Sequence, residues 1–165
     1  YELTIEEGTK FAQTPEARQE NEALAFFVAH SIKEQGFMHY EVSNFGDYQC
    51  RHNLGYWELK DYIGAGAGAV GFLKERRFYP QQDIHAYISD PLQISQELLS
   101  ADELLTEKIF LGLRSACGIE RALLSESMRK RAESLVTEDK LYQKGSRYFN
   151  KNYFLSDELA LYILG

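Results

Sequence analysis

The chain has few cysteines, few prolines and no long apolar segment, and each shortage excludes a class of protein. Its two cysteines, Cys50 and Cys117, are far apart and form no Cys-x-x-Cys pair, so we predict no disulfide framework. Three prolines and dispersed glycines argue against disorder. No apolar run approaches the roughly 18 residues of a membrane span, and the opening Tyr-Glu-Leu-Thr does not resemble a signal peptide. We therefore expect a folded, cytoplasmic protein with no membrane span.

Positive charge is also scarce. The chain has 18 lysines and arginines against 25 acidic residues, with a net charge of −7 and a pI near 5.2. Binding of nucleic acid by the whole chain is therefore not expected, because phosphate contacts need clustered Lys and Arg. Residues 120–151 are the exception, with eight basic and five acidic side chains. A solvated helix face is the commoner explanation of that excess, and a surface for a protein or nucleic acid is the alternative.

The first half of the sequence alternates between strand and helix patterns. Residues 1–6 and 37–45 predict strands, and residues 16–35 predict a helix that ends at Gly36. This order is typical of a parallel βαβ unit. We expect a loop over 46–62 with one helical turn at 54–59. Further expected elements are a strand over 63–73, a short strand over 76–80 and a short helix over 83–89. The absence of an initiating Met suggests a piece of a longer protein.

The pattern changes near residue 98, and helices come to dominate. Ser100 and Glu103 have the spacing of a capping box at the start of a helix. Further helices are expected over 120–124 and from about 127 to 144, with a break near 137. A hairpin of 146–149 and 153–155 and a last helix capped by Ser156 follow. We predict an α/β (α+β) chain with domains at 1–97 and 98–165, the second being winged-helix-like.

Ligand-type side chains are densest in residues 50–57, which read Cys-Arg-His-Asn-Leu-Gly-Tyr-Trp. Imidazole binds metals and haem iron through one nitrogen while the other donates an orienting hydrogen bond, so His52 is the candidate ligand. Asn53 could orient it, and Tyr56 and Trp57 could stack on a macrocycle. By composition alone, a histidine capping a turn beside a core tryptophan is the commoner situation. Cys50 and His52 are too few for a structural zinc site.

Two other segments are candidates for ligand contact. Gly64, Gly66 and Gly68 alternate in the expected strand, where missing side chains would let a cofactor approach the backbone, or where the chain turns a tight corner. A set of polar residues ends the strand over 37–45, where α/β barrels gather their ligand contacts, although polar turn residues explain them equally well. These are Glu41, Ser43 and Asn44. No catalytic triad, HExxH motif, P-loop or cluster-binding cysteine motif is present.

Three motifs together resemble one family. Residues 40–45 read Tyr-Glu-Val-Ser-Asn-Phe, residues 50–57 contain His-Asn-x-x-Tyr-Trp, and residues 61–69 read Asp-Tyr-Ile-Gly-Ala-Gly-Ala-Gly-Ala. They resemble the C-terminal half of HemW-type proteins, which are radical S-adenosylmethionine (SAM) proteins often described as oxygen-independent coproporphyrinogen III oxidase-like. The opening nine residues and the module from Ser100 onward are similar as well. The resemblance covers nearly the whole chain.

This resemblance implies a partial TIM-like barrel followed by a winged-helix-like domain. It also implies a [4Fe–4S] cluster and SAM in the longer parent, bound through residues upstream of this chain, so that this fragment has no radical chemistry of its own. The haem-binding role of His-Asn-x-x-Tyr-Trp carries over to His52 as iron ligand, supported by Asn53, Tyr56 and Trp57. One position departs from the pattern, because Val70 stands where the family usually has a histidine.

Three functions follow as alternatives. The first is a haem chaperone that binds haem or porphyrin and passes haem to acceptor proteins. The second is a true coproporphyrinogen III oxidase, although those enzymes lack the motifs of residues 40–45 and 50–57 in this form. The third is an interaction module that works through the basic face of residues 98–165. Missing barrel strands would leave open sheet edges, so a homodimer is also considered.

Overall fold

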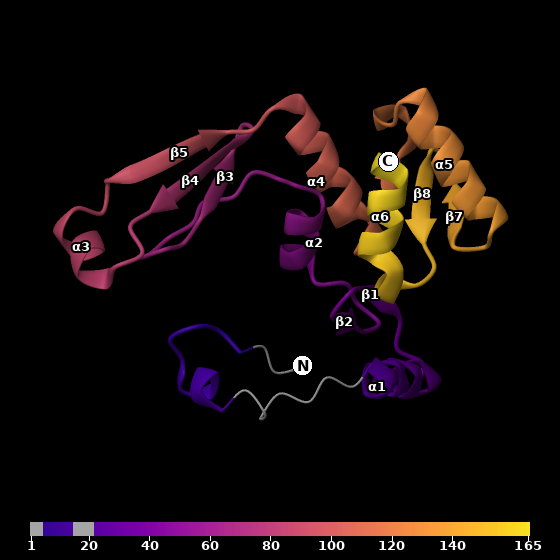
Figure 1. Ribbon diagram of the computed structural model, residues 1–165, viewed down its shortest axis with the longest axis horizontal. Helices are drawn as coiled ribbons and strands as arrows, with labels where there is room; N and C mark the ends of the chain where they lie inside the picture. Colours follow the sequence, from indigo (N-terminus) through magenta and orange to yellow (C-terminus); the bar gives the residue numbers. More distant parts are fainter. Residues whose placement is uncertain (1–4, 15–21) are drawn as a thin grey trace. The chain divides into compact units, whose positions relative to one another are not determined.

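A computed structural model describes residues 5–14 and 22–165, which form two compact units, Tyr1–Gln49 and Cys50–Gly165. They are called the first and the second unit below (Figure 1). The first unit contains a 3-10 helix, η1 (Lys10–Gln13), and the helix α1 (Glu22–Glu34). The expected strand over 1–6 lies mostly outside the described residues. The helix ends as predicted, since Gly36 has a φ of +93° and donates its N–H to Lys33 at 2.9 Å.

The expected single strand over 37–45 is instead a tight antiparallel hairpin. The parallel βαβ prediction also needs the strand over 1–6, most of which lies outside the described residues, so that pairing stays a prediction. Strands β1 (His39–Glu41) and β2 (Asn44–Phe45) pair across a turn at Val42 and Ser43. Ser and Asn favour such turns because their side chains bond to nearby groups, and here Asn44 donates to the carboxylate of Glu41. Every strand pair in the part of the chain that the structure describes is antiparallel.

The second unit holds the remaining elements. In chain order they are α2 (Arg51–Trp57), β3 (Gly71–Leu73), β4 (Arg76–Pro80), α3 (Ile84–Ser89), β5 (Ile94–Leu98), α4 (Ala101–Leu113), β6 (Ile119–Glu120), η3 (Arg121–Leu123), α5 (Glu126–Thr137), β7 (Leu141–Lys144), β8 (Arg147–Asn150), η4 (Tyr153–Leu155) and α6 (Ser156–Leu164). None of the helices among the described residues has the length and apolar character needed to cross a membrane.

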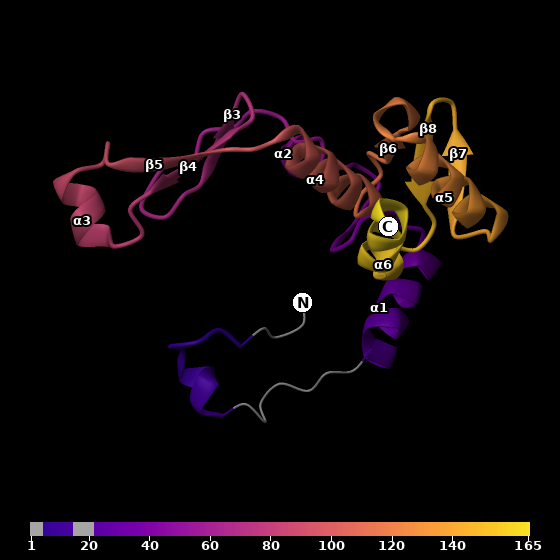
Figure 2. The ribbon, with the colours of Figure 1, turned by 45° about the horizontal axis from the view of Figure 1, so that its top comes forward.

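Strands β3, β4 and β5 form an antiparallel meander, and α3 lies at the end of this sheet away from α4 (Figures 1 and 2). The strand β4 and the helix α3 lie where the sequence predicted them, and Asp83 caps α3 by accepting from the N–H of Ala86. The strand β5 was missed. All of its residues are exposed, so it has no buried face that would produce an alternating pattern.

The glycine-alanine segment is a turn, and the predicted strand over 63–73 is correct only from Gly71 onward. Gly66 and Gly68 have φ angles of +120° and +69°, which lie outside the strand region. The segment folds back on itself, and an isolated bridge joins Tyr62 to Phe72 through N–O distances of 2.7 and 2.9 Å. Glycine permits this reversal because it adopts positive φ without a steric penalty.

The last part of the chain packs three helices against a sheet of order β6-β8-β7 (Figure 1). Its core is made entirely of residues beyond position 108. They are Ile109, Leu113, Ile119, Leu124, Ala132, Leu135, Leu141, Tyr148, Leu159, Ala160 and Ile163. A second, smaller cluster of Phe72, Leu99 and Leu104 lies where the β3-β4-β5 sheet meets α4. The predicted boundary at 97/98 falls at the end of β5 and divides the smaller cluster, since Phe72 precedes it while Leu99 and Leu104 follow it.

Two details of this part correct the sequence interpretation. The hairpin is β7 and β8, closed at Gly145, rather than 146–149 and 153–155, so the expected helix stops at Thr137. Gly145 supplies the positive φ of +59° that the two-residue turn needs. Ser156 does not cap α6 through its side chain. Its buried hydroxyl donates to the backbone of α4 and η4 and accepts from Asn150.

The capping box at the start of α4 is confirmed, and it supports a stability prediction. Ser100 accepts from the N–H of Glu103, whose carboxylate accepts from the N–H of Ser100 at 2.7 Å. Ser100→Ala should lower the free energy of unfolding by about 1 kcal/mol, because the N–H of Glu103 loses its partner. Ser100→Thr keeps the acceptor and should remain near wild type. Urea denaturation followed by circular dichroism would measure both, and equal stability of Ala and Thr variants would contradict the cap.

Candidate functional site

The helix α2 carries the motif that the sequence placed in a loop. It begins at Arg51, so His52, Asn53, Tyr56 and Trp57 all lie on one short helix. Residues four apart share a helix face, and residues one apart differ by about 100°. His52 and Tyr56 therefore lie on one face, and Asn53 and Trp57 on another. The structure brings the four predicted haem-binding residues onto one element but divides them between two faces.

The face with His52 continues into a row of aromatic rings. The rings of His52 and Tyr56 meet edge to face at 4.8 Å, and those of Tyr56 and Tyr62 at 4.7 Å. Tyr62 in turn lies 6.3 Å from Phe72, measured between ring centroids. His52 and Tyr56 are exposed, so a ligand can reach the imidazole. Burial raises the pKa of the Tyr62 phenol, which keeps the hydroxyl protonated and able to donate a hydrogen bond.

The same tyrosines line a groove of about 450 Å³ beside α4, called the α2–α4 groove below. The two helices lie side by side within the second unit (Figure 2). Most of the lining is aromatic or aliphatic, and two arginines add positive charge. The lining residues are Tyr56, Leu59, Tyr62, Arg77, Thr106, Glu107, Phe110, Leu111 and Arg114. A volume of this size falls in the range of small-molecule sites.

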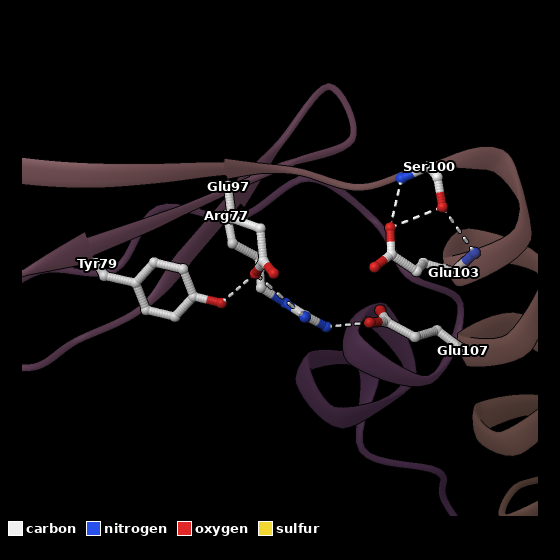
Figure 3. A network of polar contacts seen from close by, with 6 residues as sticks. All are labelled: Arg77, Tyr79, Glu97, Ser100, Glu103 and Glu107. Carbon is white, nitrogen blue, oxygen red and sulfur yellow. Dashed lines mark hydrogen bonds and ion pairs between the residues drawn. The ribbon is translucent and has the colours of Figure 1, made fainter.

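One of the two arginines belongs to a polar network that joins the β3-β4-β5 sheet to α4 (Figure 3). Arg77 on β4 pairs with Glu107 on α4, and its Nη1 lies 3.8 Å from the carboxylate of Glu97 on β5. Tyr79 donates its hydroxyl to that carboxylate at 2.6 Å. This bond raises the pKa of the Tyr79 phenol, because the protonated form is the donor. Arg77 thus faces two carboxylates.

The other arginine lies seven residues beyond Glu107 on α4, two helical turns along the same side. Arg114 donates through Nε and Nη2 to the two carboxylate oxygens of Asp157, at 2.8 Å each. Its guanidinium carbon lies 5.6 Å from the centroid of the Phe110 ring. The paired hydrogen bonds raise the pKa of Arg114 and lower that of Asp157. The arginine is held in one orientation against an aromatic wall of the groove.

Trp57, on the other face of α2, borders a different hollow, a cleft of about 400 Å³. Cys117 and several charged residues, Lys108 among them, line it as well. Burial raises the pKa of the Cys117 thiol, so at neutral pH this side chain is a thiol and not a thiolate ligand.

Cys50 precedes α2 and is exposed. Residues 5–14 and 22–165 contain no group of three or more His, Cys, Asp or Glu side chains placed to hold a metal ion.

The glycines of the turn differ in what surrounds them. A Cβ on Gly64 would lie 2.0 Å from the carbonyl oxygen of Ala69, so the turn itself requires glycine there. A Cβ on Gly68 would be 3.6 Å from Gln82, whereas nothing lies within 4 Å of one on Gly66. The tight corner explains Gly64 without a ligand. Contact of a cofactor with the backbone at Gly66 and Gly68 stays a prediction.

The polar residues predicted for the strand end lie in the first unit. Glu41 is buried, with 2% of its surface exposed, and accepts from Asn44 Nδ2 at 2.5 Å. Ser43 is exposed in the turn between them. The ring of His39 stacks on Phe45 at 4.0 Å, and burial lowers the pKa of that imidazole. These contacts give Glu41 and Asn44 a structural role in the hairpin, and a role in binding stays a prediction.

Sequence reasoning missed the groove residues Tyr62, Phe110 and Arg114. Tyr62 stands in the segment before the glycines, but nothing in its spacing links it to Tyr56. Arg114 and its partner Asp157 are 43 positions apart. No local sequence pattern indicates that two residues so far apart form an ion pair. Only the packing of α4 beside α2 and α6 brings these residues to one place.

Comparison of this structure with solved structures shows the class of fold. No family model matches the chain. A solved structure described as coproporphyrinogen III oxidase (HemN) from Escherichia coli, a radical SAM enzyme, aligns with a TM-score of 0.58 over 85% of this chain and 39% of the oxidase. The sequence identity is 10%, so this likeness concerns the fold alone. The mixed α/β chain thus has the fold of part of a HemN-like radical SAM enzyme.

The closer relationship is to proteins named heme chaperone HemW. The protein from Mycobacterium tuberculosis is 32% identical over 100% of this chain and 46% of its own length. The protein from Synechocystis is 33% identical over 83% of this chain and 37% of its own length. The protein from Escherichia coli is 42% identical over 43% of this chain and 20% of its own length. This chain therefore belongs to the family of proteins named heme chaperone HemW. It spans about half the length of these relatives, or less.

Proposed function

We propose that this chain is the haem-binding part of a haem chaperone, with His52 as a ligand of the haem iron. The observation that carries the proposal is the exposed imidazole of His52 at the head of the aromatic row of Tyr56 and Tyr62. The homology to proteins named heme chaperone supports it over the whole chain. Transfer of haem to acceptor proteins is proposed as the function of the longer protein.

The residues present suit a haem in their chemistry. A neutral imidazole nitrogen binds iron, and the edge contact with Tyr56 restricts the rotation of the ring. Aromatic side chains beside the imidazole offer apolar surface to a macrocycle. We assign Asn53 and Trp57 a supporting role, since they share the other face of α2 and Trp57 borders the second cleft. When bound, the haem is cargo that the longer protein passes on.

A further part of the proposal concerns the longer parent protein. A [4Fe–4S] cluster and SAM are proposed for that protein, and no residue of this chain is assigned to either.

The remaining parts of the proposal concern this chain. Val70, partly buried just before β3, offers no imidazole where the family usually has one. We further propose a partial barrel within residues 1–97 and a winged-helix-like domain over 98–165, supported by the separate core of the latter. A cytoplasmic location and association through the edge strand β5 are also proposed.

An oxidase that decarboxylates coproporphyrinogen III is the second candidate. The fold likeness to HemN favours it, but that likeness carries 10% identity, against about 32% to the chaperones. A third candidate, an interaction module on the basic residues of 120–151, is weakened by local pairing. Ion pairs with acidic residues of the same region neutralise five of the eight cations. These are Arg121, Lys130, Lys140, Arg147 and Lys151.

Titration with haemin, followed by the Soret band, tests the role of His52. We expect saturable one-to-one binding by the wild type and at least about tenfold weaker binding by His52→Ala, because removing even an outer-shell partner of a metal site weakens affinity that much. His85→Ala is the matched control, since His85 is also an exposed helical imidazole. Identical Soret spectra and affinities for wild type and His52→Ala would overturn the assignment of the iron ligand.

A further inference from the structure

We propose that the α2–α4 groove holds the tetrapyrrole, and that Arg114 pairs there with one of its propionate carboxylates; this rests on the proposed haem-binding function. The groove continues directly from the imidazole. Tyr56 both touches the ring of His52 and lines the groove, and Tyr62 touches Tyr56 and lines it too. A planar ligand centred at His52 that spreads over these tyrosines therefore reaches the groove.

The lining matches a ligand that is apolar over its face and acidic at one edge. The rings of Tyr56, Tyr62 and Phe110 and the side chains of Leu59 and Leu111 provide the apolar surface. A tetrapyrrole with propionate groups also brings carboxylates, which an apolar groove alone would leave without compensation. The groove also offers positive charge, since two of its nine lining residues are arginines and one, Glu107, is acidic.

The ion pairs decide which arginine is available. Arg77 already faces the carboxylates of Glu107 and Glu97, so the local charge around it is negative. Arg114 faces the single carboxylate of Asp157 and uses only Nε and Nη2 for it. A guanidinium has five N–H donors, so those on Nη1 remain for a second acceptor. Asp157 orients the group, while the Phe110 ring beneath it forms the adjacent wall.

Two variants of this ion pair separate a role in binding from a role in folding. Arg114→Gln should bind haemin about tenfold more weakly than wild type, because a charge-assisted bond to the propionate is lost. Asp157→Asn removes the negative charge of the pair but keeps the cation and a side-chain oxygen that can still accept from the guanidinium and orient it, so binding should stay within about twofold of wild type. Circular dichroism would confirm that both are folded. Equal weakening by the two variants would overturn the carboxylate contact, as would no effect of Arg114→Gln.

The dimethyl ester of haem, in which both carboxylates are blocked, tests the chemistry of the contact. Wild type and Arg114→Gln should bind this ester equally, while His52→Ala should still weaken its binding. A loss with the ester as large as that with haemin would overturn the pairing of Arg114 with a propionate. If only His52→Ala failed to weaken binding, the assignment of His52 as iron ligand would be overturned instead. The two proposals can therefore fail independently.

The place of binding is tested by filling the groove. Thr106 is partly buried in its lining, and Thr106→Trp should weaken the binding of both haemin and the ester. Lys108→Gln removes a cation from the other cleft, beside Trp57, and should leave haemin affinity unchanged. Weakening by Lys108→Gln without weakening by Arg114→Gln or Thr106→Trp would place the ligand in that cleft and overturn the proposal.

Discussion

Leu113→Ala is expected to lower the free energy of unfolding by about 2–5 kcal/mol, among the largest effects of any single substitution in this chain. Leu113 ends α4 and has 0% of its surface exposed. Its side chain packs in the core shared by α4, α5, α6 and the β6-β8-β7 sheet. Truncation removes buried methyl groups and leaves a cavity that the surrounding helices fill only in part. The stability therefore falls both by the lost transfer free energy of the methyl groups and by the cost of the remaining cavity.

The same substitution at an exposed site is the control. Leu161 lies on α6 with 60% of its surface exposed, and Leu161→Ala should change the free energy of unfolding by no more than about 0.5 kcal/mol. Urea denaturation at several wavelengths of circular dichroism would give both values. If the two variants lost the same stability, the assignment of Leu113 to a packed core would be wrong.

Gly118→Ala is the second substitution for which we expect a large effect, a loss of about 2–4 kcal/mol. Gly118 has a φ of +64°, a conformation that disfavours any Cβ. An added Cβ would also lie 2.6 Å from the carbonyl oxygen of Tyr148 and 2.7 Å from a ring carbon of Phe149. Backbone strain and steric overlap therefore add, where β8 passes close to the turn after α4.

Gly145→Ala separates those two contributions. Gly145 has nearly the same φ, +59°, but nothing lies within 4 Å of the Cβ it lacks. This variant should show only the strain, about 1 kcal/mol. The difference between the two variants, measured by thermal or urea unfolding, is the energy of overlap at Gly118. A difference near zero would show that β8 moves away to admit a methyl group.

Elements with a strong local signal could be predicted from the sequence. The start of α4 follows from Ser100 and Glu103, whose side chains bond to each other's backbone within one turn. The helix α1 ends just before Gly36 for a similarly local reason, and β4 and α3 occupy the expected ranges. In each case the interactions that fix the element lie within a few residues, so the sequence pattern contains them.

The errors arose where distant contacts or turn chemistry decided the outcome. The segment of Gly64, Gly66 and Gly68 read as a strand because glycine gives no hydrophobic pattern, while its positive φ angles make it a turn. Residues after Thr137 continued a helical pattern, but pairing with β8 makes them a strand. The β1–β2 hairpin was read as one strand because its two-residue turn is too short to interrupt the pattern.

The candidate site was predicted in part. Residue types alone identified His52, Tyr56 and Trp57 as ligand-type groups but did not favour a haem site over an ordinary turn, and the family resemblance made that choice. Neither route indicated that α2 splits the motif between two faces. The partners that complete one face, Tyr62 and Arg114, come from segments that only tertiary packing brings to α2 and α4.

The position of the sole tryptophan gives the protein an intrinsic optical reporter. Trp57 is partly buried on the same short helix as His52, and no other indole contributes to the emission. Its fluorescence therefore originates next to the proposed iron ligand. A haem absorbs strongly in the region where indole emits, so a bound haem would quench this light by energy transfer. Occupancy of the site and its emptying into an acceptor could thus be followed in real time with no label attached.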